Sequence, residues 1–212
     1  MLISIMKCLH YPIYKLRLRG LLPYITAYLQ EADRVLDVGC GNGALGRAIM
    51  ESPLCPPRVA VTGLERIKRG GELSPVEYYD GQQIPHSKDA FEVVILADVL
   101  HHETDPHNLI DECTRVARRL LIIKDHKVEG ILAKQRIMFM DWASNMQYGI
   151  PCLYRYNSAQ EWTAWYKQHN LVVDRELHFM KIYPPIINHV FGGHLQYLAV
   201  LRKDGAKTMT TE

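Results

Sequence analysis

The feature that most constrains this chain is an apolar strand pattern that runs directly into a glycine-rich turn, VLDVGCGNGALG at residues 35–46. Glycine adopts backbone conformations that other residues avoid, so this spacing lets the chain turn sharply and approach a ligand closely. The helix pattern that follows would direct its amino terminus at that ligand. The sequence therefore predicts a strand–turn–helix unit that binds an adenosine-containing molecule.

The glycines of this turn fit two spacings at once. Gly41, Gly43 and Gly46 give the G-x-G-x-x-G of a dinucleotide-binding turn. Gly39, Gly41 and Gly43 give the tighter G-x-G-x-G found in methyltransferases that use S-adenosyl-L-methionine (SAM). Glycine spacing alone does not separate the two ligands.

Acidic residues near the strand ends favour SAM. Asp37 lies inside the first predicted strand, where a carboxylate is costly unless it holds a polar group. It would hold backbone groups of the turn and, through water, the cationic amino group of SAM. Glu65 ends the second strand and would bind ribose hydroxyls in either interpretation. Asp80 follows the third strand, where it would accept from an adenine amino group, and Asp98 follows the fourth.

Composition limits the other classes of function. The 212 residues are 48% apolar and 23% charged, with a formal net charge of +2, which is ordinary for a globular protein. No basic stripe stands out, so we expect no nucleic-acid partner. Five scattered cysteines without a C-x-x-C pair predict reduced thiols and a cytoplasmic location.

The first 22 residues are apolar and basic, which raises the question of a signal peptide or a membrane segment. Lys7, His10 and Pro12 interrupt the apolar run, and no small-residue cleavage site follows it. No window holds 18 uninterrupted apolar residues, so we expect no transmembrane helix. We expect a helix packed over the protein's own site, with peripheral contact of an amphipathic helix with a membrane surface as the alternative.

Strand and helix patterns alternate along the chain, as they do around a parallel sheet. We expect an α/β, Rossmann-like doubly wound fold in one domain, 1–205. An N-terminal helical segment (1–33), a helical cap insertion (127–157) and a flexible tail (206–212) complete it. The expected strands are 34–38, 58–64, 76–79, 91–97, 120–124, 171–180 and 194–202, and the expected helices are 43–51, 105–120, 129–148 and 158–169.

The runs RVLDVGCGNG and DGQQIPHSKDAFEVVILADVLHH, with the acidic strand end between them, resemble class I SAM-dependent methyltransferases. The similarity is strongest to small bacterial enzymes, of the type 11-like group, that act on small molecules. It implies a seven-stranded, mostly parallel sheet with an antiparallel last strand, and SAM as the cofactor. The residues that it places around SAM are Asp37, Gly39, Cys40, Gly41, Gly43, Glu65, Asp80, Gly81 and Asp98.

The chain departs from that family between the second and third strands. Only RIKRGGELSP, residues 66–75, joins them, where the family usually has a helix. Two glycines and a proline make a helix improbable here. The ribose side of the site is therefore expected to be open or covered by the N-terminal segment.

Methyl transfer from a sulfonium requires alignment, desolvation and, for an oxygen acceptor, removal of a proton. Histidines are the candidates for that base. His101 and His102 follow the fourth strand, and His126 follows Asp125 on the fifth. Because side chains alternate along an extended chain, we expect at most one of His101 and His102 to face the methyl group. Alternation continued from Asp98 favours His102.

The run HHETDPH, residues 101–107, also invites a metal interpretation. It lacks the H-E-x-x-H spacing, and Asp105-Pro106 indicates a helix N-cap followed by proline, so we expect no metal. We therefore expect methyl transfer to O or N of a small-molecule acceptor. A catalytically silent SAM-binding accessory or sensor protein and an NAD-dependent oxidoreductase are the alternatives. Aromatic and methionine residues of the cap would line an apolar substrate pocket or the core: Met138, Phe139, Met140, Trp142, Tyr148, Tyr154 and Tyr156.

Overall fold

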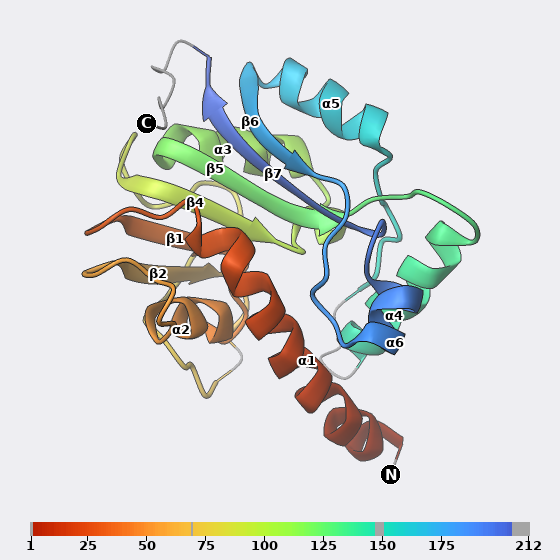
Figure 1. The fold of residues 1–212 in the computed structure, drawn as a ribbon. Coiled ribbons are helices and arrows are strands. Elements are labelled where there is room, and N and C mark those ends of the chain that lie inside the picture. The colour runs from red at the N-terminus through yellow and green to blue at the C-terminus, as the bar shows by residue number, and fades with distance from the viewer. Residues whose placement is uncertain (1, 69, 147–150, 205–212) are drawn as a thin grey trace.

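A computed structural model describes residues 2–68, 70–146 and 151–204, and over those residues the centre of the fold is a seven-stranded sheet (Figure 1). Its order is β3-β2-β1-β4-β5-β7-β6, and β7 runs antiparallel to both neighbours, β5 and β6. The predicted fold class is thus confirmed. The strands are β1 (Arg34–Val38), β2 (Ala60–Glu65), β3 (Val76–Tyr78), β4 (Phe91–Ala97), β5 (Ala117–His126), β6 (Leu171–Leu177) and β7 (Gln196–Lys203).

Helices cover both faces of the sheet, because its central strands are apolar on both sides. In β4, Val93 and Ile95 belong to the core under α1 and α2, whereas Val94 and Leu96 belong to the core under α3 and α5. Strands buried on both faces are typical of parallel sheets. The helices are α1 (Leu2–Thr26), α2 (Ala44–Met50), α3 (Pro106–Val116), α4 (Ala133–Asn145), α5 (Ala159–Gln168) and α6 (Pro185–Phe191).

Two helix starts follow the chemistry that the sequence indicates. Asp105 caps α3, its side chain accepting from the backbone N–H of Asn108, with proline in the first turn. Ser158 and Glu161 form the predicted capping box at the start of α5.

Several predicted boundaries are wrong. The helix expected over 105–120 ends at Val116, because Ala117 already begins β5, which pairs on both sides and runs to His126. The cap helix expected from 129 begins at Ala133, since Leu132 before it is left-handed (φ 51°). Helix α6 was not predicted. The expected tail, 206–212, lies outside the described residues.

The second half of α1 packs on the sheet, as expected for a helix that covers the protein's own fold. Leu21 and Ile25 are fully buried, and Gly20 lies against the backbone of Ile182. A Cβ at Gly20 would stand 2.7 Å from the Ile182 carbonyl oxygen, so only glycine allows this close approach.

We predict that Gly20→Ala destabilises the protein, although alanine is the better helix former. The clash with the backbone of Ile182 has no flexible side chain to absorb it. The free energy of unfolding should fall by about 1–2 kcal/mol, and each kcal/mol should lower Tm by about 2–4 °C. Thermal unfolding measures it, with Arg19→Ala, exposed one residue away, as the control. An unchanged or higher Tm for Gly20→Ala would contradict this packing.

Candidate active site

The glycine turn after β1 adopts left-handed backbone conformations that its sequence was expected to require. Gly39, Gly41 and Gly43 have φ values of 71°, 62° and 76°. A Cβ at Gly39 would lie 2.6 Å from the Val99 side chain, so the turn also packs directly against the chain that follows β4. Cys40 is buried, and its Sγ faces Gly63 of β2.

Glu65, at the carboxyl end of β2, is buried and holds the glycine turn. Its Oε2 accepts from the Gly41 backbone N–H at 2.9 Å, and its Oε1 accepts from the Arg66 and Ile67 N–H groups at 2.7 and 3.3 Å. Glu65 therefore ties the glycine turn to the chain that follows β2, at the position where ribose hydroxyls were expected.

Asp37 is a buried carboxyl group whose Oδ2 has no hydrogen-bond partner among the described residues. Burial, reinforced by the negative charge of Glu65, raises the pKa of Asp37 to about 7. A buried unpartnered carboxylate oxygen is costly. The environment of Asp37 therefore suits a donor or cationic group of a ligand.

The short connection between β2 and β3 forms no helix over 66–68 and 70–75, as predicted. It lies on the glycine turn: the Leu73 N–H donates to the Asn42 carbonyl at 2.8 Å, and Ser74 Oγ donates to the Gly43 carbonyl at 3.0 Å. The connection between β2 and β3 thus packs on the glycine turn. The sequence predicted only an open ribose side or one covered by the N-terminal segment.

Asp80 and Gly81 lie just past β3. Asp80 is exposed, and its Oδ1 accepts from the backbone N–H of Gln82 at 2.8 Å. Gly81 is left-handed (φ 84°), and a Cβ there would meet Arg66. The Asp80 carboxylate therefore orders its own turn and leaves Oδ2 for another partner.

Asp98, which follows β4, lies close to three basic side chains. Lys124 Nζ donates to its Oδ1 at 2.5 Å, Arg17 of α1 pairs with its Oδ2, and His126 Nε2 lies 3.8 Å from Oδ1. Burial and the charge of Arg17 lower the pKa of Lys124. Sequence reasoning placed α1 over the site but could not find this ion pair, because 81 residues separate its members.

A buried cluster of histidines and aspartates occupies the carboxyl ends of β4 and β5. His101 Nδ1 lies 2.6 Å from Asp125 Oδ1, and its Nε2 lies 3.7 Å from Asp141 Oδ1. His102 Nε2 lies 3.4 Å from the same oxygen. The expected strand alternation is wrong, because Leu100–His102 form a 3-10 turn, η1, which brings both rings to one carboxylate.

Asp141 connects this cluster to the cap. It lies on α4, and its carboxylate accepts from Tyr156 Oη at 2.6 Å and from Asn145 Nδ2 at 2.8 Å. It is only 3% exposed, so the hydrogen bonds offset the cost of burying its charge. Sequence reasoning left its side undecided. The pattern that could have indicated its burial is a single charged residue among apolar neighbours, FMDW at residues 139–142.

The three candidate bases have different protonation states. Burial lowers the pKa of His101, but the charges of Asp125 and Asp141 outweigh it and raise the value to about 9. Burial and the charge of His101 lower the pKa of His102, and burial with Lys124 lowers that of His126 well below 6.5. At pH 7, His101 is therefore an imidazolium, whereas His102 and His126 are neutral.

The cluster also contains side-chain atoms of the kinds that bind divalent metal ions. Ligand atoms of His101, Asp125 and His126, and those of His101, His102 and Asp141, lie within 4.8 Å of one another. The contacts His101–Asp125 and Asp141–Tyr156 are hydrogen bonds without any ion. The absence of a metal stays a prediction. It was made from residues 101–107 alone, whereas Asp125 and His126 of β5 and Asp141 of α4 lie outside that run.

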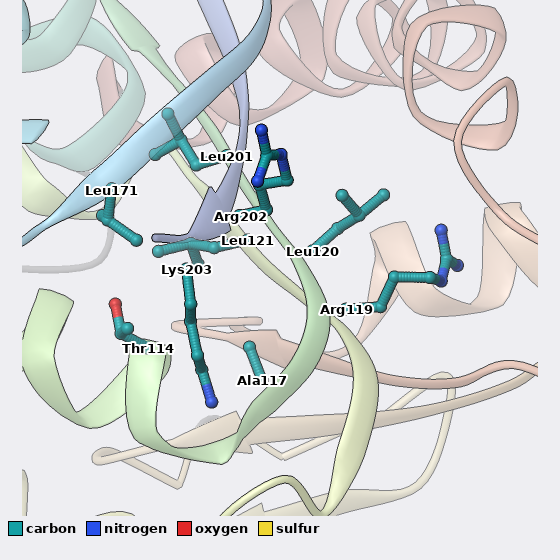
Figure 2. A pocket seen from close by; sticks show the side chains of 9 residues that line it. All are labelled: Thr114, Ala117, Arg119, Leu120, Leu121, Leu171, Leu201, Arg202 and Lys203. Carbon is teal, nitrogen blue, oxygen red and sulfur yellow. The ribbon is translucent and has the colours of Figure 1, made fainter. Parts of the chain in front are cut away.

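A cavity of about 340 Å³ opens beside the cluster. Its wall includes His101 and Asp125 together with the aromatic side chains of Tyr156, Trp162 and Trp165. Figure 2 shows a different hollow, between α3, β5, β6 and β7, with a volume of about 10 Å³. It has room for about one water molecule and contains none of the candidate residues.

Comparison with known families supports this geometry. The family model of the methyltransferase domain matches residues 11–176, most of the chain. The chain belongs to the methyltransferase domain family. This membership confirms the resemblance seen in the glycine turn.

Individual relatives of this methyltransferase match over shorter stretches. It is 32% identical over 117 residues to 27-O-demethylrifamycin SV methyltransferase of Amycolatopsis mediterranei, covering 48% of this chain and 39% of that protein. It is 26% identical to a ubiquinone biosynthesis O-methyltransferase of Cronobacter sakazakii, covering 40% and 38%. The matched part is thus about two-fifths of either relative. A SAM-dependent methyltransferase of Aquifex aeolicus has the same fold, with a TM-score of 0.59 at 19% identity over 94% of this chain and 97% of that one.

We predict that Asp37→Asn removes a pH dependence of stability in the methyltransferase without ligands. The folded-state pKa is raised from 3.8 to about 7, so the folded state binds the proton more tightly. The associated stability is fully present below about pH 4 and is lost as the pH rises to about 7, on the order of 4 kcal/mol at most.

Urea unfolding of the wild type and Asp37→Asn between these pH values measures the difference. Asp204→Asn, which changes an exposed carboxylate at the end of β7, is the matched control. Parallel pH profiles for the wild type and Asp37→Asn would contradict the inferred environment of Asp37.

Proposed function

We propose that this methyltransferase transfers the methyl group of SAM to an oxygen or nitrogen atom of a small-molecule acceptor. The observation that carries the proposal is that two sets of residues lie next to each other at one edge of the sheet. The glycine turn with Asp37 and Glu65 follows β1 and β2, and the histidine–aspartate cluster follows β4 and β5. Val99 packs on Gly39 between them, so the two groups are contiguous.

The residues of the glycine turn fit SAM. The unpartnered Asp37 oxygen suits a water-mediated bond to the amino group of the methionine part, and the buried Glu65 carboxylate, which holds the glycine turn, would accept from ribose hydroxyls. Asp80 Oδ2 would accept from the adenine amino group. When bound, SAM supplies a methyl group on a sulfonium that is already activated for in-line displacement.

His102 is our choice for the general base. It is neutral at pH 7, its side chain is 16% exposed against 4% for His101 and 7% for His126, and Asp141 lies 3.4 Å from its Nε2. A base must be neutral and within reach of the acceptor. The His102 ring lies 4.1 Å, centroid to centroid, from the ring of His101, which lines the cavity described above. His101, protonated between two aspartates, acts instead as a positioning residue that holds η1 against β5 and the cap.

The cavity beside the cluster favours a flat, partly aromatic acceptor with a hydroxyl group. Trp162, Trp165 and Tyr156 line the cavity with aromatic side chains, and Arg155 and His107 add polar groups at the wall. Two relatives described above are named for O-methyl transfer or for methylation of a demethyl natural product, which agrees with an oxygen acceptor. A third, of Schizosaccharomyces pombe, is named as a tRNA methyltransferase, which is why tRNA is included in the test below.

We predict that Glu65→Ala weakens SAM binding by roughly tenfold or more, because ribose hydroxyls and the Gly41 N–H lose a charged acceptor. Isothermal titration calorimetry with SAM, S-adenosylhomocysteine and NAD measures it. Glu51→Ala, exposed at the end of α2, is the control. Tight NAD binding would instead favour an oxidoreductase, and an unchanged SAM dissociation constant would remove Glu65 from the site.

We predict that His102→Ala lowers turnover by on the order of a hundredfold while SAM affinity stays unchanged, since a base acts on the acceptor. Wild-type activity should fall on acidification below pH 6.5, as His102 gains a proton, and this limb should vanish in the variant. The measurement is S-adenosylhomocysteine release with a panel of aromatic hydroxyl acceptors.

The same panel separates the alternatives. If His126→Ala abolishes turnover and His102→Ala does not, the base lies on β5. If SAM binds and no acceptor on the panel is methylated, the catalytically silent accessory or sensor role is favoured. Methylation of transcribed tRNA in place of the small molecules would overturn the small-molecule proposal.

A further inference from the structure

Three segments that are far apart in the sequence lie together on the side of the sheet where α1 passes α4 and α6 (Figure 1). They are residues 2–26, 130–140 and 178–194, which we call the basic face. Tyr24 Oη accepts from the Lys181 N–H, and Tyr183 Oη donates to Met140 Sδ. These contacts join α1 to the 178–194 segment, and that segment to α4.

The basic face contains no acidic residue, although the chain has 23 aspartates and glutamates. Of the carboxylates just outside its segments, Asp141 is buried in the cluster described above, Glu129 pairs with Lys127 and lies 3.9 Å from His194, and Glu176 lies 3.4 Å from His178. Its exposed basic side chains among the described residues are Lys15, Arg19, Lys134 and Lys181, whereas Arg17 is paired with Asp98. A net charge near zero for the whole chain thus conceals a strongly one-sided distribution.

The same face exposes large apolar side chains. Ile131 and Ile186 are 85% and 84% exposed, and Leu132 and Phe139 are more than half exposed. The Arg136 guanidinium donates to the carbonyls of Val190 and, at 3.5 Å, of Ile131, so the 131–132 turn and α6 lie on either side of one arginine. Exposed apolar groups gathered in this way mark an interaction surface.

We propose that the basic face docks on the surface of an anionic lipid bilayer. Apolar side chains such as Ile131 and Ile186 would enter the boundary between headgroups and acyl chains, and the lysines would lie against acidic headgroups. Nucleic acid would neutralise the lysines and leave the apolar side chains in water. A second copy would bring two like charges together. Among the described residues, no helix is long and apolar enough to cross a membrane.

This proposal is independent of the proposed function, because none of its test residues belongs to the candidate active site. The full chain is sedimented with vesicles of phosphatidylcholine alone and of phosphatidylcholine with phosphatidylglycerol. We expect binding to the anionic vesicles that weakens as salt rises, since salt screens the charges. The neutral vesicles should bind far less.

The double variant Ile131→Ser, Ile186→Ser should bind anionic vesicles roughly tenfold more weakly or worse, because two apolar groups no longer enter the bilayer. Leu54→Ser, which changes an apolar residue 55% exposed after α2, is the matched control and should bind like the wild type. Lys134→Glu should weaken binding to the anionic vesicles and leave binding to the neutral vesicles unchanged.

Three results would overturn the proposal. The first is no sedimentation with anionic vesicles. The second is equal loss of binding in Leu54→Ser and the double variant. The third is a concentration-dependent dimer in light scattering that the double variant abolishes, which would make this face an interface between copies of the chain.

Discussion

Parallel pairing of the central strands is the constraint on which the rest of the structure depends. Asp37 of β1 stands beside Gly63 of β2 on one side and Ile95 of β4 on the other. In parallel strands the carboxyl ends share one edge, so the glycine turn, Glu65, Asp98 and the histidine–aspartate cluster all lie there. A ligand at this edge can contact residues that come from four strands.

Burial of charge gives this edge its chemical character. Asp37, Lys124, Asp125 and Asp141 are buried, and the last three are each paired with an opposite charge. Asp125 and Asp141 hold the imidazolium of His101, which lowers the pKa of Asp125 to about 2 against the effect of burial. Oδ2 of Asp37, like Oδ2 of Asp125, has no hydrogen-bond partner among the described residues. The groups paired with an opposite charge therefore fix the architecture. Asp37, which has no such pair in the part of the chain that the structure describes, indicates where a ligand contributes.

The cap and the N-terminal helix connect this edge to the surface of the molecule. Asp141 fastens α4 to the cluster from inside, while Phe139 and Trp142 of the same helix are exposed on the outside. Arg17 fastens α1 to Asp98, and its neighbours Lys15 and Arg19 are exposed. Helices α1 and α4 therefore each have one side in the candidate active site and another on the basic face. A lipid surface bound to the basic face would contact the same two helices that form the wall of the candidate active site.

The sequence by itself determined the sheet class, the glycine turn and the capped starts of α3 and α5. These features rest on local rules: glycine permits left-handed backbone, apolar periodicity reports burial, and Asp105 or Ser158 caps the chain next to it. Only the tertiary structure decided how His101 and His102 meet Asp141, how Arg17 reaches Asp98, and where one-sided charge gathers. Those contacts join residues tens of positions apart, and a turn such as η1 ends the alternation from which side-chain direction is predicted. Local pattern carries no information about such distant partners, because their proximity depends on how all the elements pack together.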